Sequence, residues 1–243
     1  MLLQLVYTEI IKYKRTMIPW IISLGGGFAA FIALMLVMTG GLQKSWEVLI
    51  IRGLNLVNML ALLLVAVISG YVFINEYHEG TIGTIFTLPV SRLKIYFTKF
   101  FIILFMVFAL YLSFFLLTML FGMIFIGGLP PTDFMLKFFK IIFILSAVSF
   151  ALAPVTVMIS IIFRSIGTYL LVGMSYFLVY MGFINSDYSM KIPPCIPDRL
   201  VADCMVSEFI TRGDLTGIIV VLSVTFIITF IAGAFYYSQY AVK

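Results

Sequence analysis

Residues Asn75–Lys99, NEYHEGTIGTIFTLPVSRLKIYFTK, form a polar and charged segment between two long apolar runs. The run before this segment, Leu54–Ile74, and the run after it, Phe100–Ile126, are each long enough to cross a bilayer, which needs about 20 apolar residues per helix. The segment is therefore predicted to be a loop between two membrane-spanning helices. Because most of the remaining chain is apolar, this loop is the substantial internal segment best suited to meet a soluble partner.

The composition of the whole chain supports a membrane protein. Of the 243 residues, 63% are hydrophobic and 10% are charged, and the mean hydropathy is +1.21. Soluble domains are roughly 45–50% apolar and about 25% charged, so a soluble domain of this length could not bury so much apolar surface. The formal charge of +5 is scattered along the chain, which predicts no nucleic-acid partner.

Six apolar runs are long enough to be membrane-spanning helices, the fifth being the shortest: Ile18–Met38, Leu54–Ile74, Phe100–Ile126, Phe138–Phe163, Thr168–Ile184 and Ile218–Tyr237. They predict an all-α membrane protein with one transmembrane domain over residues 1–243. The first run is too long for a signal peptide and lacks a small-residue cleavage site, so we expect it to stay as a permanent anchor. Gly25–Gly27 and Pro154 lie in or at the ends of spans, where we expect close packing rather than kinks beside a pathway.

The charges suggest an orientation for these spans. An even number of spans places both termini on one side of the membrane. With the N-terminus inside, eight of the 15 basic residues lie inside, namely Lys12, Lys14, Arg15, Arg92, Lys94, Lys99, Arg164 and Lys243, and seven lie outside. This bias is small, but the basic cluster before the first span favours cytoplasmic termini, because the first helix usually dominates orientation.

The first 17 residues predict an amphipathic helix on the inner membrane surface. Leu2, Leu3, Val6, Ile10 and Tyr13 fall near one helical face, whereas Glu9 and Lys12 fall toward the other, and Arg15 follows. This pattern is typical of a helix in the plane of the interface. The alternative is a frayed polar leader.

Residues 185–216 are predicted to form a long extracellular loop. Pro193, Pro194 and Pro197 break its first half, and Asp198 is a candidate cap for a short helix through Ile210. Cys195 and Cys204 both lie here. In an oxidising exterior they are candidates for a disulfide, and two free thiols are the equal alternative.

Several kinds of chemistry are absent from the sequence. It has no GxxxxGK[S/T] phosphate loop, no HExxH and no CxxC, and its single histidine, His78, is expected to be a solvated loop residue rather than a metal ligand. The spans carry almost no ionisable side chains at mid-depth, which argues against transport driven by an ion gradient and against a lipid-phosphate hydrolase. If the protein moves a cargo uphill, another subunit must supply the energy.

The polar loop itself predicts two short helical segments. Thr81–Thr87 suits a short helix that Pro89 ends, and Ser91 is a candidate cap for the helix that leads into the third span. Such a helix and stiff turn would make a mechanical lever. An ordinary hairpin loop fits these residues equally well.

The loop resembles the segment between spans two and three of type-2 ABC exporter permeases. The resemblance rests on Glu76, Gly80, Thr81, Leu88, Pro89, Ser91, Arg92 and Lys99. The segment Thr8–Arg15, TEIIKYKR, is also similar to the region before span one in bacterial members, and the permeases of bacitracin-resistance and lantibiotic-immunity transporters are the most similar in character. The motifs cover about forty residues, as a rough count, whereas the six-span architecture extends over the whole chain.

The resemblance implies a set of roles. The segment 75–99 would be a cytoplasmic coupling loop whose helix docks on a separate ATPase subunit, which would bind ATP and Mg²⁺, so this chain would carry no cofactor of its own. Glu76 and Glu79 would contact the ATPase or cap the coupling helix, Gly80 would allow a tight bend, and Arg92 would pin the loop. Thr81, Leu88, Pro89 and Ser91 belong to the same motif.

The resemblance also implies partners and a cargo. The chain would pair with a second permease, identical or related, in a bacterial plasma membrane, and would expel from the lipid an amphipathic peptide antibiotic or a similar envelope-active compound. This would make it a determinant of antimicrobial peptide resistance or bacteriocin immunity. The alternatives are a permease for a drug, a lipid or sodium, a membrane sensor or scaffold, and an intramembrane enzyme. The residues that bind cargo are not identifiable, because every span face is apolar.

Overall fold

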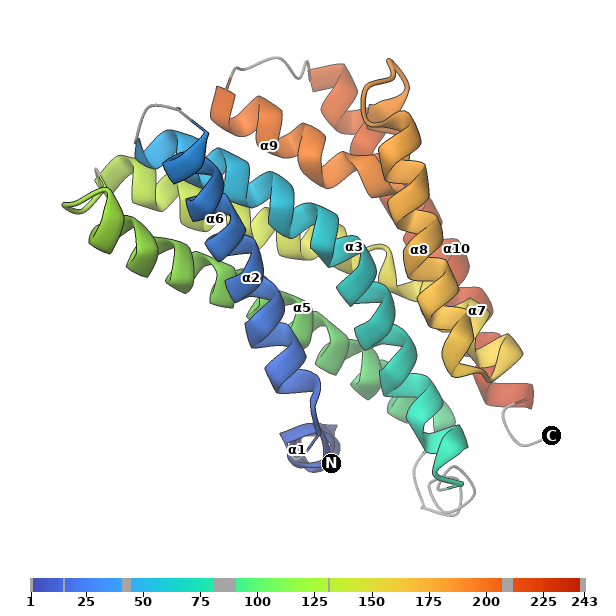
Figure 1. Ribbon diagram of the computed structural model, residues 1–243. Coiled ribbons are helices and arrows are strands. Elements are labelled where there is room, and N and C mark those ends of the chain that lie inside the picture. Colours follow the sequence, from blue (N-terminus) through green and yellow to red (C-terminus); the bar gives the residue numbers. More distant parts are fainter. Residues whose placement is uncertain are drawn as a thin grey trace.

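The computed structural model describes residues 2–14, 16–40, 45–80, 91–130, 132–206 and 212–240. The helices in these ranges are α1 (Leu2–Lys14), α2 (Ile18–Thr39), α3 (Trp46–His78), α5 (Arg92–Phe125), α6 (Thr132–Phe150), α7 (Ala153–Phe163), α8 (Ile166–Phe183), α9 (Ile196–Val206) and α10 (Arg212–Tyr240), with short 3-10 turns η1 (Ser189–Lys191) and η2 (Pro193–Cys195) before α9. Figure 1 shows the spans running side by side between two ends of the molecule. We call these the α1 end and the α9 end.

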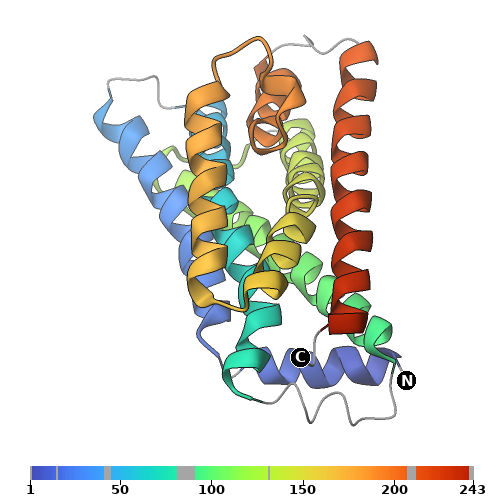
Figure 2. The ribbon, with the colours of Figure 1, turned by 90° about the vertical axis from the view of Figure 1, so that its right-hand side faces the viewer.

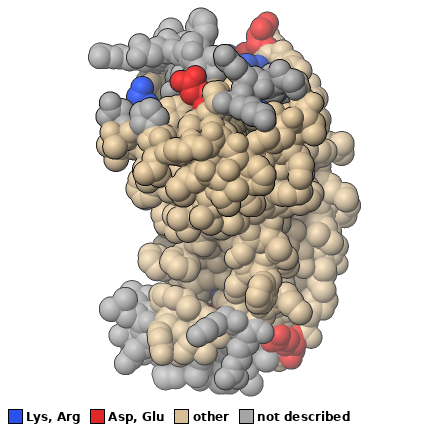
Figure 3. Space-filling model, turned by 60° about the vertical axis from the view of Figure 1, so that its left-hand side comes forward, with Lys and Arg blue, Asp and Glu red and all other residues tan. Residues whose placement is uncertain are grey.

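The prediction of an all-α protein with six membrane-spanning segments is confirmed. Within the described residues, six helical segments are long and apolar enough to cross a membrane: Ile18–Thr39, Trp46–His78, Arg92–Phe125, Phe134–Phe163, Ile166–Phe183 and Leu215–Gln239. Charged side chains gather at the two ends of the molecule, with a broad uncharged band between them (Figure 3). Such a band is the surface that a hydrocarbon layer covers.

Helix α3 is longer than its predicted span, and α5 combines the predicted third span with the helix predicted to lead into it. They contain 33 and 34 residues, which at 1.5 Å per residue is about 50 Å and exceeds the bilayer core of about 30 Å. Both helices continue into the polar segment: residues 75–78 are helical rather than loop, whereas residues 92–99 belong to the helix predicted to follow Ser91. The part of that segment outside the two helices is therefore residues 79–91.

An N-terminal helix is present at the predicted place. Helix α1 lies across the ends of the spans rather than parallel to them (Figure 2). Its Tyr13 is 2% exposed and donates a hydrogen bond to the carbonyl oxygen of Val72 on α3 at 3.2 Å. One face of α1 is thus bound to the bundle by a buried polar contact.

Small residues allow close packing of the spans, as expected for Gly25–Gly27. A Cβ atom on Gly26 would lie 2.8 Å from the backbone nitrogen of Phe114, so α2 and α5 touch backbone to backbone there. On the other side of the bundle, a Cβ on Gly70 of α3 would lie 2.2 Å from the Cβ of Tyr169 on α8. These contacts set the spacing of the helices.

The fourth span is broken, which differs from the single helix predicted over Phe138–Phe163. Helix α6 ends at Phe150, two residues form a turn, and α7 begins at Ala153 with Pro154 in its first turn. Proline suits a first turn because that position needs no N–H donor. The carbonyl oxygen of Leu152 accepts a hydrogen bond from the Tyr176 hydroxyl of α8 at 3.1 Å, so a neighbouring helix satisfies the broken backbone.

The last span joins the bundle through aromatic rings near the α1 end. Phe230 of α10 lies 5.2 Å from Tyr96 and 4.8 Å from Phe100, ring centroid to centroid, and Tyr237 lies 5.7 Å from Phe73. Edge-to-face and tilted ring pairs at such distances stabilise the fold by more than the burial of their apolar area alone.

The predicted long loop after the fifth span contains a helix, but its start differs from the prediction. Helix α9 begins at Ile196 rather than at Asp198, and Asp198 is buried instead of capping the helix from solvent. The predicted extension of this helix to Ile210 lies outside the described residues.

Candidate functional site

The predicted coupling loop is described only at its two flanks. Glu79 and Gly80 follow α3, and Ser91 precedes α5, whereas Thr81, Leu88, Pro89 and the predicted helix over residues 81–87 lie outside the described residues. Glu79 is exposed, and its Oε1 accepts a hydrogen bond from Nδ2 of Asn75 at 2.6 Å. Gly80 has a φ of +66°, a left-handed conformation that only glycine adopts without strain and that turns the chain out of α3.

Glu76 is not at the surface, which corrects the contact with a partner that its position in the motif suggested. Its side chain is fully buried in the last turn of α3. Oε1 lies 3.0 Å from Nζ of Lys12 on α1, and Oε2 lies 2.7 Å from Nζ of Lys99 on α5. The carboxylate thus joins three helices inside the protein.

Lys99 is also fully buried, although the sequence placed it at the edge of a polar loop. Its ammonium group donates a second hydrogen bond to the carbonyl oxygen of Val72 at 2.7 Å, the same oxygen that Tyr13 contacts. We call Lys12, Tyr13, Val72, Glu76 and Lys99 the basal clamp. Burial, and then the nearby charges of Glu9 and Glu76, raise the pKa of Tyr13 well above its usual value, so the clamp holds a neutral hydroxyl.

The charges of the basal clamp depend on one another. A buried charge is tolerated only when it is paired and hydrogen-bonded, and removing one partner of such a pair costs about 3–5 kcal/mol. Here Glu76 faces two ammonium groups, so its carboxylate is the central member. Loss of Glu76 would leave two like charges facing each other across the junction of α1, α3 and α5.

Arg92 connects the start of α5 to the end of α10, rather than pinning the loop alone. Its Nη1 donates to the carbonyl oxygen of Ser238 at 2.8 Å, and carbonyl groups at a helix C-terminus attract cations. Ser91 occupies the N-cap position of α5 as predicted, but its side chain forms no capping hydrogen bond.

A further contact at this end involves the turn between α7 and α8. The guanidinium of Arg164 lies 5.3 Å from the ring centroid of Tyr77, next to Glu76 on α3. With the basal clamp and Arg92, this contact ties three segments, namely α1, the end of α10 and the turn between α7 and α8, to the helices that flank residues 79–91. A displacement of that loop would therefore be passed to the whole α1 end.

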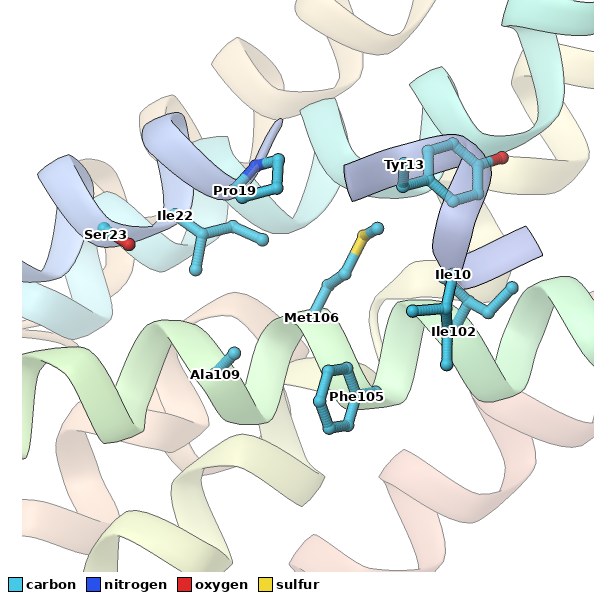
Figure 4. Close-up of a pocket in the computed structure, with 9 residues that line it drawn as sticks. All are labelled: Ile10, Tyr13, Pro19, Ile22, Ser23, Ile102, Phe105, Met106 and Ala109. Carbon is cyan, nitrogen blue, oxygen red and sulfur yellow. The ribbon is translucent and has the colours of Figure 1, made fainter. Parts of the chain in front are cut away.

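An apolar cavity of about 290 Å³ lies beside the basal clamp, between α1, α2 and α5. Met106 extends from α5 into the space toward α1 (Figure 4). The lining is almost entirely hydrocarbon and aromatic, and comprises Ile10, Tyr13, Pro19, Ile22, Ser23, Ile102, Phe105, Met106 and Ala109. It suits an apolar chain rather than an ion or a sugar.

The remaining predicted residues occupy different places. Glu9 lies on α1, one turn before Tyr13, while Arg15 lies outside the described residues. Cys195 is a free, fully buried thiol, and burial raises its pKa. The side chain of Cys204 lies outside the described residues, but because Cys195 is free, the structure does not contain the predicted alternative of a Cys195–Cys204 disulfide. Among the side chains that the structure describes, no three His, Cys, Asp or Glu residues gather in a way that could hold a metal ion.

Comparison with known proteins identifies a family. A family model described as "ABC-2 family transporter protein" matches residues 5–182, which include most of α1, the loop at residues 79–91, the basal clamp and most of α8. No curated protein matched the chain.

Proposed function

The chain belongs to the ABC-2 family of transporter proteins, and we propose that this ABC permease subunit is part of an ATP-driven exporter. In that assembly two permeases, identical or related, pair in the membrane of a bacterium. Two separate ATPase subunits bind ATP and Mg²⁺ and hydrolyse the nucleotide. The α1 end faces the cytoplasm, so that residues 79–91 meet the ATPase and both termini lie inside.

The observation that carries the coupling role is the basal clamp. The loop at residues 79–91 begins three residues after Glu76 and ends eight residues before Lys99, and these two side chains form an ion pair of 2.7 Å. The two arms of the loop are therefore fixed to each other in the protein interior. A push on the loop moves α3 and α5 together, and Lys12 carries the movement to α1.

Within this scheme, exposed groups of the loop make the contact with the ATPase. Glu79 is exposed, and Gly80 has open space around its Cα, so both are accessible to a docking surface. Thr81, Leu88 and Pro89 form the coupling helix and its stop, and Ser91 and Arg92 anchor the second arm. Glu76 contributes through the clamp and not through contact with the partner.

The proposed cargo is an amphipathic peptide antibiotic or a similar envelope-active compound. Support comes from the uncharged surface of the spans and from the apolar cavity beside α1, at the level where the spans meet the proposed inner membrane surface. A molecule with one apolar face partitions into that layer before it reaches the permease. The resemblance to bacitracin-resistance and lantibiotic-immunity permeases points to the same class.

The test is purification of the tagged chain from its native membrane, followed by an ATPase assay on the intact complex. We expect an ATPase subunit to co-purify and its turnover to fall at least about fivefold in Glu79→Lys, because charge reversal opposes docking. Asp187→Lys is the matched control, since it reverses an exposed carboxylate at the α9 end. Purification without an ATPase, or equal turnover in both variants, would contradict the coupling role.

The cargo is tested separately in cells. Expression of the complex should protect a sensitive strain against amphipathic peptide antibiotics, and Glu79→Lys should remove this protection while Asp187→Lys retains it. Protection against small drugs alone would leave the permease role intact but would replace the proposed cargo.

A further inference from the structure

A chain of hydrogen bonds joins the middle of the bundle to α9. The Tyr111 hydroxyl of α5 donates to Oδ1 of Asn58 on α3 at 3.0 Å, and Nδ2 of Asn58 donates to Oδ1 of Asp198 at 2.9 Å. The Tyr180 hydroxyl of α8 donates to Oδ2 of Asp198. At the other end, Oγ of Ser149 on α6 lies 2.7 Å from the Tyr111 oxygen. We call these five residues the polar chain.

The polar chain has a direction. Because the Tyr111 proton is used toward Asn58, Ser149 must be the donor in its contact with Tyr111. Every donor in the series Ser149, Tyr111, Asn58 therefore points toward Asp198, and Tyr180 donates to the same carboxylate from the opposite side. The five side chains are buried, with Tyr111 fully enclosed and Asp198 8% exposed. The series thus ends on one acceptor, which α9 supplies.

Attaching α9 through a buried carboxylate carries the free-energy cost of desolvating a charge. Ile196 and Val201 of α9 are fully buried, and Ile196 packs with Ile218 of α10 and Val148 of α6, so apolar contacts already hold the helix. A well-packed apolar residue of similar volume at position 198 would add to these contacts without the cost of desolvating a charge, whereas alanine would leave a cavity and two donors without their acceptor. The main effect of Asp198 is therefore to fix the position in which α9 docks, rather than to increase the stability of the docked state. A polar contact that fixes a position without adding much stability can open and close readily.

The surroundings of Asp198 do not offer it a direct ion pair among the contacts of the described residues. The cation whose charge acts on the carboxylate is Arg199, and its Nη2 donates to the carbonyl oxygen of Ile184 at the end of α8. Cys195 and Tyr180 are the other titratable groups around the carboxylate. The carboxylate is thus held by neutral donors on α3 and α8, and movement of either helix breaks a specific bond.

The far end of the polar chain lies at the break in the fourth span. Ser149 precedes the turn Ala151–Leu152 by two residues, and Leu152 is tied to α8 by Tyr176. Rotation of α6 relative to α7 would move Ser149 away from Tyr111 and loosen the support of Asn58. The break and the docking of α9 are therefore connected through four consecutive polar groups.

We propose that the polar chain is a latch. It holds α9 against α3, α6, α8 and α10 in the closed state seen here, and α9 separates from them when the fourth span moves at its break during transport. The opening step rests on the proposed function, because it uses the ATP-driven cycle. The docking of α9 through Asp198, by contrast, does not depend on the proposed ATPase. In Figure 2, α9 lies between α8 and α10 at the end opposite α1, where separation would open the bundle.

Cys195 provides a native reporter of the latch. It lies directly before α9, is fully buried and packs with Leu62, Leu152 and Tyr180. The chain has two cysteines, so Cys204→Ser leaves Cys195 as the only thiol. The experiment measures the rate at which a water-soluble maleimide labels Cys195 in the complex with its ATPase, reconstituted in lipid nanodiscs that expose both faces.

Without nucleotide, we expect slow labelling of the Cys204→Ser protein and labelling about tenfold faster in Asp198→Ala, because α9 loses its docking point. Asp187→Ala, which removes an exposed carboxylate from the same loop, should label like the parent. Tyr180→Phe keeps the ring and removes one donor, so it should give a smaller increase of about threefold. If Asp198→Ala fails to fold, the labelling rate of Tyr180→Phe tests whether the polar chain holds α9 closed. Labelling at the parent rate in the folded variants would overturn the latch.

With ATP and Mg²⁺, labelling of the parent protein should rise about tenfold, toward the rate of Asp198→Ala. An unchanged rate at full ATPase turnover would overturn opening during the cycle. Failure of the proposed function would give a different result, because no ATPase would bind the chain. The difference in labelling rate between the parent and Asp198→Ala without nucleotide would remain, and it would support closure by Asp198.

Discussion

Nζ of Lys99 lies 2.7 Å from Oε2 of Glu76, and both side chains are fully buried. The two residues stand on opposite sides of the loop at residues 79–91, so the pair closes that loop at its base. Lys12 adds α1 to the same carboxylate at 3.0 Å. A fully buried ion pair therefore lies at the base of the loop that is proposed to receive force from the ATPase.

Removal of the central carboxylate should destabilise the protein strongly. Glu76→Gln leaves the ammonium groups of Lys12 and Lys99 close together without their counter-charge, and we expect a loss of about 3–5 kcal/mol. Glu47→Gln, on the exposed first turn of the same helix, should change stability by less than about 0.5 kcal/mol. Thermal unfolding in detergent compares the two variants.

The two members of the buried pair should be coupled. Lys99→Met alone removes one of the two ammonium groups that face Glu76 and leaves Lys12, whereas Glu76→Gln/Lys99→Met removes both members of the buried pair together. The double variant should lose less stability than the sum of the single variants, with an interaction energy of about 1–3 kcal/mol. Additive losses within about 0.5 kcal/mol would show that the pair contributes no specific interaction.

The contact between α3 and α8 should not accept a methyl group. In Gly70→Ala the new Cβ would lie 2.2 Å from Cβ and 2.3 Å from Cγ of Tyr169. The Cβ of Tyr169 is fixed by the α8 backbone, so a rotamer change cannot relieve that clash. Overpacking of this kind costs about 1–3 kcal/mol. Gly182→Ala on α8 meets nothing within 4 Å and should be neutral or slightly stabilising in the same melting experiment.

The Tyr111 hydroxyl should matter more than other tyrosine hydroxyls. Tyr111→Phe leaves Oδ1 of Asn58 and Oγ of Ser149 without their buried partner, which should cost about 1–3 kcal/mol. Tyr188 is exposed, and Tyr188→Phe should have no measurable effect on the melting temperature. Equal melting temperatures for the two variants would show that water or another group satisfies the polar chain.

Stability should depend on pH through Asp198. Burial raises the pKa of this carboxyl, while the hydrogen bonds from Tyr180 and Asn58 and the charge of Arg199 oppose the rise. A carboxyl with a raised pKa in the folded state contributes stability that is fully present below its unfolded pKa of about 3.9 and is lost as the pH rises through the folded pKa. The melting temperature of the parent should therefore fall relative to Asp198→Asn over that window. A constant difference between the two proteins would contradict the shift.

The sequence predicted the spans because their apolar length is a direct signal, and Ile18–Met38 matches α2 within one residue. The end of α3 was missed because Glu76 carries a charge, which marks a loop unless its partners are known, whereas the start of α5 after Ser91 was predicted. Lys12 and Glu76 are 64 positions apart, and no local pattern connects them. Their pairing is a result of tertiary packing.

The α9 end was harder to predict for a similar reason. Asp198 looked like a helix cap because acidic residues favour a first turn. Its main partner, Asn58, is 140 positions away on α3, and only folding brings the two together. The break at Leu152 had a weak signal in Pro154. The coupling helix over residues 81–87 stays a prediction, since its residues lie outside the described part of the chain.

The basal clamp also imposes an order on biosynthesis. Lys12 leaves the ribosome 64 residues before Glu76 and 87 before Lys99. Until α3 has been inserted, α1 has neither its carboxylate partner nor the Val72 carbonyl that Tyr13 contacts. In a nascent chain that stops within α3, the face of α1 that carries Tyr13 would stay exposed, and proteases could cleave the chain there. Docking of the N-terminal helix is thus a natural checkpoint that the second span, α3, has been inserted.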